Sequence, residues 1–87
     1  MVTQEFTVKN PTGIHARPAT LLVQLCNKLS DKVTITTDKG KTVDPKNIIS
    51  VLMGGMGKGT AIRIDVEGET EADSLRQVME LLESFEE

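Results

Sequence analysis

Residues 10–19 read Asn-Pro-Thr-Gly-Ile-His-Ala-Arg-Pro-Ala, and this stretch joins a strand-like segment to a helix-like one. The segment before it, residues 2–9, alternates in hydropathy and predicts a β-strand. The cluster at residues 10–13 is typical of a turn, because Asn, Pro and Gly favour turn conformations. From residue 16 onward the apolar residues recur at helical spacing, at Ala19, Leu22, Val23, Cys26 and Leu29. The chain therefore begins with a strand, a turn and an amphipathic helix.

The same kinds of pattern continue through the rest of the chain. Further strands are predicted at residues 33–37, 42–43 and 61–66. A short helix is expected from its N-cap Asn47 to about Met53. Thr70 is the expected cap of a last helix, whose apolar stripe is Ala72, Leu75, Val78, Met79, Leu82 and Phe85. The order βαββαβα predicts an α+β fold in which three helices cover one face of a four-stranded antiparallel sheet.

Length and composition limit the classes of function. The chain has 87 residues, which predicts one small domain, residues 1–87, with little room for a deep substrate cavity. A single cysteine excludes an intrachain disulfide, and with one histidine the chain lacks the ligands of a zinc site. Aromatic residues make up 2% of the chain, which argues against a platform that stacks nucleic-acid bases. No apolar run is long enough for a membrane span or a signal peptide, so we expect a cytoplasmic protein.

Charge is distributed unevenly along the sequence. Residues 1–66 carry nine basic and five acidic residues, a net charge of +4, whereas residues 67–87 carry one basic and eight acidic residues, a net charge of −7. The acidic end is typical of a solvated helix face. The mildly basic remainder favours acidic protein partners or phosphate groups.

The chemically most informative residue is His15, the only histidine, which stands on a turn directly before a helix. Pro18 falls in the first helical turn, where its missing N–H group is not needed for a helical hydrogen bond. Free backbone N–H groups and the positive end of the helix dipole favour an anion at that position. Arg17 can add a forked contact to a phosphate group. Because imidazole is also a covalent nucleophile, this arrangement predicts acceptance and transfer of a phosphoryl group.

The residues alone leave other interpretations open. His15 can equally be a loop or cap histidine without a chemical role. The apolar character of Ile48, Ile49 and Leu52, taken alone, favours burial in the core. So short a helix, however, cannot bury all of its apolar residues. Residues 54–60 are rich in glycine, but they do not match the Gly-x4-Gly-Lys-Ser/Thr pattern of a nucleotide-binding loop. We interpret them as a turn near His15.

The motif Gly-Ile-His-Ala-Arg-Pro-Ala at residues 13–19 resembles the active-site signature of the HPr family. These bacterial proteins are the histidine-containing phosphocarriers of the phosphoenolpyruvate:sugar phosphotransferase system. The resemblance extends over essentially the whole chain, including the order of the elements and the short helix after Asn47. It implies an open-faced β-sandwich and a carrier rather than a stand-alone enzyme, without a cofactor or a metal.

The resemblance also implies a role for each matching residue. In the family, enzyme I phosphorylates the histidine on Nδ1, and the phosphoryl group then passes to the IIA component of a sugar transporter. His15 matches the phosphoryl acceptor and Arg17 the residue that supports the phosphate, with the backbone amides of Ala16 and Arg17 as further donors. The family docks its partners through an apolar patch, and the matching positions are Ala16, Thr20, Ile48, Ile49 and Leu52. We expect a monomer.

Two departures from the family pattern bear on regulation and partners. Many Gram-positive members carry a phosphorylatable serine where this chain has Asn47, so we expect that switch to be absent, with Ser50 an ordinary helix residue. Basic residues that some members place on the first helix are replaced by Gln24 and Asn27. The alternative to a sugar-pathway carrier is an HPr-like regulatory protein or nitrogen-pathway paralogue that acts by binding proteins.

Overall fold

A four-stranded antiparallel sheet in the order β1-β4-β2-β3 forms one layer of the computed structural model, which describes residues 1–86. The strands are β1 (Val2–Thr7), β2 (Lys32–Thr37), β3 (Thr42–Val43) and β4 (Ala61–Glu67). Central β4 pairs with β1 from Val2 opposite Val66 to Thr7 opposite Ala61. On its other side β4 pairs with β2 from Lys32 opposite Glu67 to Thr37 opposite Ile62. β3 pairs with β2 at two positions only, Ile35 opposite Val43 and Thr36 opposite Thr42.

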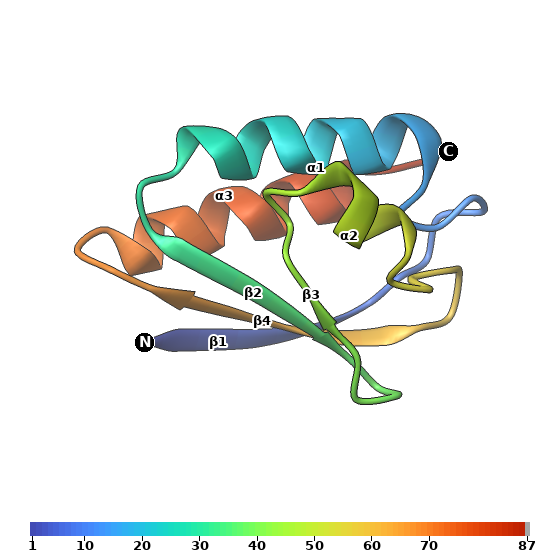
Figure 1. Ribbon diagram of the computed structural model, residues 1–87, viewed down its shortest axis with the longest axis horizontal. Coiled ribbons are helices and arrows are strands. Elements are labelled where there is room, and N and C mark those ends of the chain that lie inside the picture. The colour runs from blue at the N-terminus through green and yellow to red at the C-terminus, as the bar shows by residue number, and fades with distance from the viewer. Residues whose placement is uncertain (87) are drawn as a thin grey trace.

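Three helices form the second layer: α1 (Ala16–Lys28), α2 (Ile48–Leu52) and α3 (Glu71–Ser84). All three lie on the same face of the sheet, with α2 beside α1 (Figure 1). The predicted α+β class, the βαββαβα order and the open sheet face are confirmed. Among residues 1–86 no helix is long and apolar enough to span a lipid bilayer.

The core lies between the two layers and follows the predicted periodicities. Every second residue of β4 is buried, as are Leu22 and Cys26 on α1. The other face of the sheet stays polar, with Arg63 exposed and Asp65 half-buried. Burial raises the pKa of the Cys26 thiol to about 12, which makes it a packing residue, as predicted.

The structure corrects the details of the last helix. Ala72 was expected on the buried stripe but is exposed, and Ser74 is buried in its place. Ser74 Oγ donates a hydrogen bond to Asp31 Oδ2 over 2.6 Å, which satisfies the buried hydroxyl. Thr70 occupies the N-cap position, yet its side chain makes no capping bond and donates to the same carboxylate over 2.5 Å. The carboxylate of Asp31, a residue far away in the sequence, thus accepts the hydrogen bonds of both hydroxyl groups at the start of this helix.

Candidate functional site

His15 occupies the N-cap position of α1 in an extended conformation, with φ −145° and ψ 163°. Its side chain is exposed and makes no capping hydrogen bond. Residues on either side hold it in place: Ile14 is 2% exposed, and its N–H donates to Met56 O over 2.8 Å. Pro18 lies in the first turn of α1, as predicted from its missing N–H group, and its side chain is buried. The imidazole therefore projects into solvent from a rigidly packed backbone.

The next residue, Ala16, has a φ of +51°, and it is the only non-glycine residue among residues 1–86 with a positive φ. The left-handed region costs an L-amino acid about 1–2 kcal/mol. Such strain persists only where neighbouring packing imposes it, and it occurs preferentially at functional sites. Here it bends the chain sharply between the extended His15 and the helix.

Gly13 shapes the wall next to His15. Its φ is +69°, and a Cβ at this position would lie 2.6 Å from Met56 O and 2.7 Å from Gly57 Cα. Asn10, only 3% exposed, closes the turn through a 2.8 Å bond from Nδ2 to Gly13 O. The glycine-rich segment therefore packs directly against the turn that carries His15. This proximity agrees with the position expected for it.

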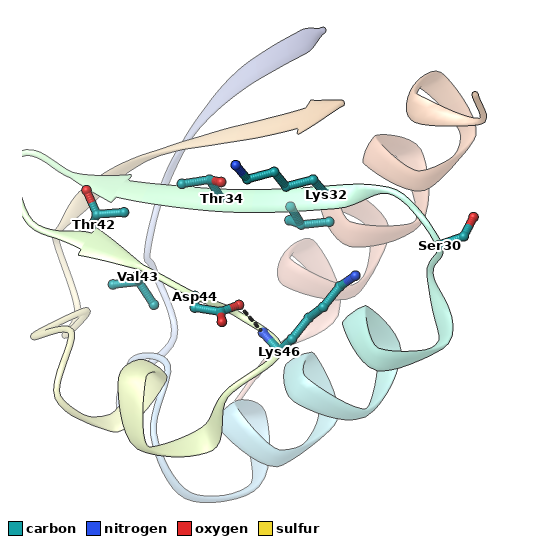
Figure 2. Close-up of a pocket in the computed structure, with 8 residues that line it drawn as sticks. Ser30, Lys32, Thr34, Thr42, Val43, Asp44 and Lys46 are labelled. Carbon is teal, nitrogen blue, oxygen red and sulfur yellow. Dashed lines mark hydrogen bonds between the residues drawn. The ribbon is translucent and has the colours of Figure 1, made fainter. Parts of the chain in front are cut away.

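A shallow groove of about 290 Å³ runs along this contact and is lined by Thr12, Ile14, His15, Leu52, Gly55, Met56 and Gly57. A larger depression of about 450 Å³ lies elsewhere, between the first half of β2 and the segment after β3 (Figure 2). It contains neither His15 nor Arg17. We assign the candidate site to the smaller groove, because it is lined by His15, the exposed imidazole that the sequence predicts as the nucleophile.

Arg17 is exposed, but its side chain does not line the groove of His15. It borders a neighbouring depression of about 280 Å³ with Pro18, Leu21, Ser84, Phe85 and Glu86. The structure thus keeps Arg17 two residues from His15 along the chain but turns it toward the end of α3. Arg17 thus lies next to the candidate site in the sequence without lining its groove.

Four apolar side chains of α2 and its C-cap are exposed: Ile48 by 38%, Ile49 by 68%, Leu52 by 41% and Met53 by 66%. The interpretation of Ile48, Ile49 and Leu52 as core residues is wrong, because only Val51 of this helix turns inward. Ala16 and Thr20 on α1 are also exposed, as the family resemblance implies. We call Ile48, Ile49, Leu52 and Met53 the α2 patch. Leu52 also lines the groove of His15, so the patch reaches the candidate site.

Met53 is a member of this surface that the sequence did not assign to it. A methionine at the end of a short helix more often fills a gap in the core or a loop, because its side chain adapts to irregular spaces. Met53 is instead the C-cap of α2, followed by the buried Gly54. A helix position one turn after Ile49 was the available signal for its exposure.

Asn47 caps α2 as predicted. Its Oδ1 accepts hydrogen bonds from the N–H groups of Ile49 over 2.9 Å and Ser50 over 3.2 Å. Ser50 is half-buried, and its Oγ accepts a bond from Asp44 N over 2.9 Å. Within residues 1–86, no three His, Cys, Asp or Glu side chains come together as metal ligands.

Comparison with known proteins places this geometry in one family. A family profile described as "PTS HPr component phosphorylation site" matches residues 2–84. The phosphocarrier protein HPr of Xylella fastidiosa is 37% identical over 84 residues, which cover 97% of this chain and 93% of that protein.

Solved structures give the same result. HPr from Thermoanaerobacter tengcongensis superposes with a TM-score of 0.90 at 33% identity, covering 97% of this chain and 93% of that one. The catabolite repression protein Crh of Bacillus subtilis, described as a dimer with a swapped domain, has a TM-score of 0.74 at 32% identity, covering 95% and 94%. The chain belongs to the HPr family of phosphocarrier proteins.

Proposed function

We propose that this protein accepts a phosphoryl group on His15 from phosphorylated enzyme I and passes it to IIA components of sugar transporters. The observation that carries the proposal is the exposed imidazole at the start of α1, fixed by buried neighbours and open to a shallow groove. A carrier must present its nucleophile to large protein partners in turn, and a surface site on a rigid backbone suits that task. In this proposal the protein acts in the cytoplasm, as a carrier rather than a stand-alone enzyme.

The transfer itself is a displacement at phosphorus. The lone pair of His15 Nδ1 attacks the phosphoryl group of the donor imidazole while the ring proton stays on Nε2. The bond from phosphorus to the donor nitrogen breaks, and that nitrogen keeps the electron pair. The N-terminus of α1, with the backbone amides of Ala16 and Arg17, supplies positive potential for the phosphoryl oxygens. Arg17 adds a charge-assisted contact once its side chain moves toward His15.

Partner docking uses the α2 patch together with Ala16 and Thr20. All of these residues are exposed on α1 or α2 and its C-cap, and Leu52 also lines the groove of His15. An exposed apolar cluster beside a reactive group favours a protein interface. Asn47 caps the helix without offering a hydroxyl, so serine-based control at this position is absent. We expect the protein to dock as a monomer.

Intact mass after incubation with phosphoenolpyruvate and enzyme I of the same organism tests the carrier function. We expect one added phosphoryl group that is acid-labile and absent from His15→Ala. Thr12→Ala, which alters the same groove without removing the imidazole, is the matched control. A chain that gains no mass while enzyme I phosphorylates a known HPr would refute the proposal.

The second candidate function is a regulatory module that binds a protein through the α2 patch without phosphoryl transfer. The size of this patch favours it, since four apolar side chains are exposed on one short segment. A nitrogen-pathway paralogue would use the same surface. His15→Ala separates the two candidates, because a binding module keeps its partner after this change and a carrier loses its transfer activity.

A further inference from the structure

The α2 helix is too short to be stable on its own. It has five residues, and isolated helices of fewer than about 12 residues are marginal in water. Its first turn has no acidic residue, its last turn has no basic residue, and Val51 is its only buried side chain. Contacts from other elements must therefore hold it in place.

At the N-terminal end, the contacts come from α1 and the connection that follows it. Lys46, which precedes the cap Asn47, donates from Nζ to Leu29 O over 3.2 Å and to Asp31 O over 3.1 Å. In return, Asn27 Nδ2 donates to Lys46 O over 3.0 Å. Figure 2 shows the Lys46 side chain extended across the opening between β2 and the segment after β3.

At the C-terminal end, the contact comes from the β2–β3 hairpin. Lys41 Nζ donates to Met53 O, the carbonyl of the C-cap residue. The hairpin fixes the backbone of Lys41, since Thr37 N donates to Lys41 O over 2.8 Å and Lys41 N donates to Thr37 Oγ1 over 3.2 Å. A cation at a helix C-terminus also meets the negative end of the dipole. Lys41 thus supplies the basic residue that α2 lacks.

We infer that Lys41 is a positioning residue for partner docking, acting through α2 together with Lys46 and Asn27. The two ends of α2 are tied to separate elements, so the α2 patch is presented preformed and does not have to be ordered on binding. Met53, whose carbonyl Lys41 holds, is itself 66% exposed in the patch. This inference rests on the docking role proposed above for that patch.

The test compares Lys41→Met with Lys39→Met, a matched control in the same hairpin. Lys39 is exposed and has no hydrogen bond or ion pair to the residues that the structure describes. The first measurement is hydrogen exchange of the Val51 and Met53 amides, which donate to Asn47 O and Ile49 O. The second is the KM and kcat of enzyme I for each carrier variant.

In Lys41→Met we expect faster exchange at both amides and a KM for the carrier raised about three- to tenfold, with kcat nearly unchanged, because fewer molecules hold the docking conformation. Lys41→Arg should restore the KM, and Lys39→Met should match the wild type. Equal exchange and equal KM in Lys41→Met and Lys39→Met would overturn the inference. If the wild type accepts no phosphoryl group, the proposed function fails instead, and the exchange rates alone decide whether Lys41 holds α2.

Discussion

At the scale of single residues, the stability of the protein should depend more on glycine at position 13 than on glycine at position 40. Gly13 and Gly40 both have a positive φ, but a Cβ at Gly40 meets nothing within 4 Å, whereas one at Gly13 collides with Met56 and Gly57. We expect Gly40→Ala to destabilise the protein by about 1 kcal/mol through backbone strain alone. Gly13→Ala should cost about 2–4 kcal/mol, because a steric clash adds to the strain. Thermal unfolding of the two variants measures the difference, and equal losses would contradict a close contact at Gly13.

For Arg17, a substitution should affect phosphoryl transfer without affecting the fold. Because it is exposed, Arg17→Ala should leave the circular dichroism spectrum unchanged. Phosphoryl transfer through His15 should slow about 10- to 100-fold, the effect of losing one charge-assisted hydrogen bond to the transferred group. Arg17→Lys, which keeps the charge but loses the fork, should fall between the two. Time courses of phosphoryl transfer from phosphorylated enzyme I measure the rates. An undiminished rate in Arg17→Ala would exclude Arg17 from the mechanism.

At the scale of the element, α2 divides its side chains between two tasks. Val51 is 1% exposed and Ile49 is 68% exposed, although only one turn of helix contains both. Val51→Ala should lower the free energy of unfolding by about 2 kcal/mol, because it removes buried methyl groups. Ile49→Ala should change stability by less than about 0.5 kcal/mol and should weaken binding to enzyme I.

Denaturant unfolding and calorimetric titration with enzyme I make this comparison directly. A binding loss in Val51→Ala that exceeds the loss in Ile49→Ala would contradict an interface formed by the exposed face. The same result would show that docking depends on the stability of α2 more than on its exposed side chains. Both variants keep His15 and its groove unchanged, so a defect in the transfer chemistry is not expected in either.

At the scale of the whole molecule, the sequence predicted the sheet and helix layers better than the polar contacts that connect one element to another. Alternation in β2 and β4 and the helical stripes of α1 and α3 predicted the elements and the core, because those patterns follow directly from burial on one face. The exposure of Ile48 and Ile49 could not be predicted from periodicity, since a helix of this length has too few residues to define a face. The family resemblance supplied that surface. The contacts of Asp31, Lys41 and Lys46 join residues far apart in sequence, and no local pattern predicts them.

Asp31 is an example of such a contact, because it connects the segment before β2 to the start of α3. It lies between α1 and β2, is 3% exposed, and accepts hydrogen bonds from Thr70 and Ser74 at the start of α3. A Cβ at Gly68 would collide with its carboxylate, so the connection before α3 also fits around this group. The hydroxyl groups of Ser74 and Thr70 hold the pKa of the Asp31 carboxyl below its usual range, because they stabilise the ionised form.

This lowered pKa makes the stability of the protein depend on acid. The stabilisation from Asp31 is fully present above the pKa of an unfolded aspartate, about 3.9, and is lost as the pH falls through the lower pKa of the folded state. We expect Asp31→Asn to lower the Tm at pH 7 and to make the further fall in Tm below about pH 4 shallower than in the wild type. Asp73 provides the control, because Arg76 and Gln77 lower the pKa of this exposed carboxyl as well. Added salt should screen the contribution of the exposed Asp73 to stability and leave that of the buried Asp31. If high salt abolished the fall in Tm of the wild type at acid pH, this would argue against Asp31 as the source of that fall.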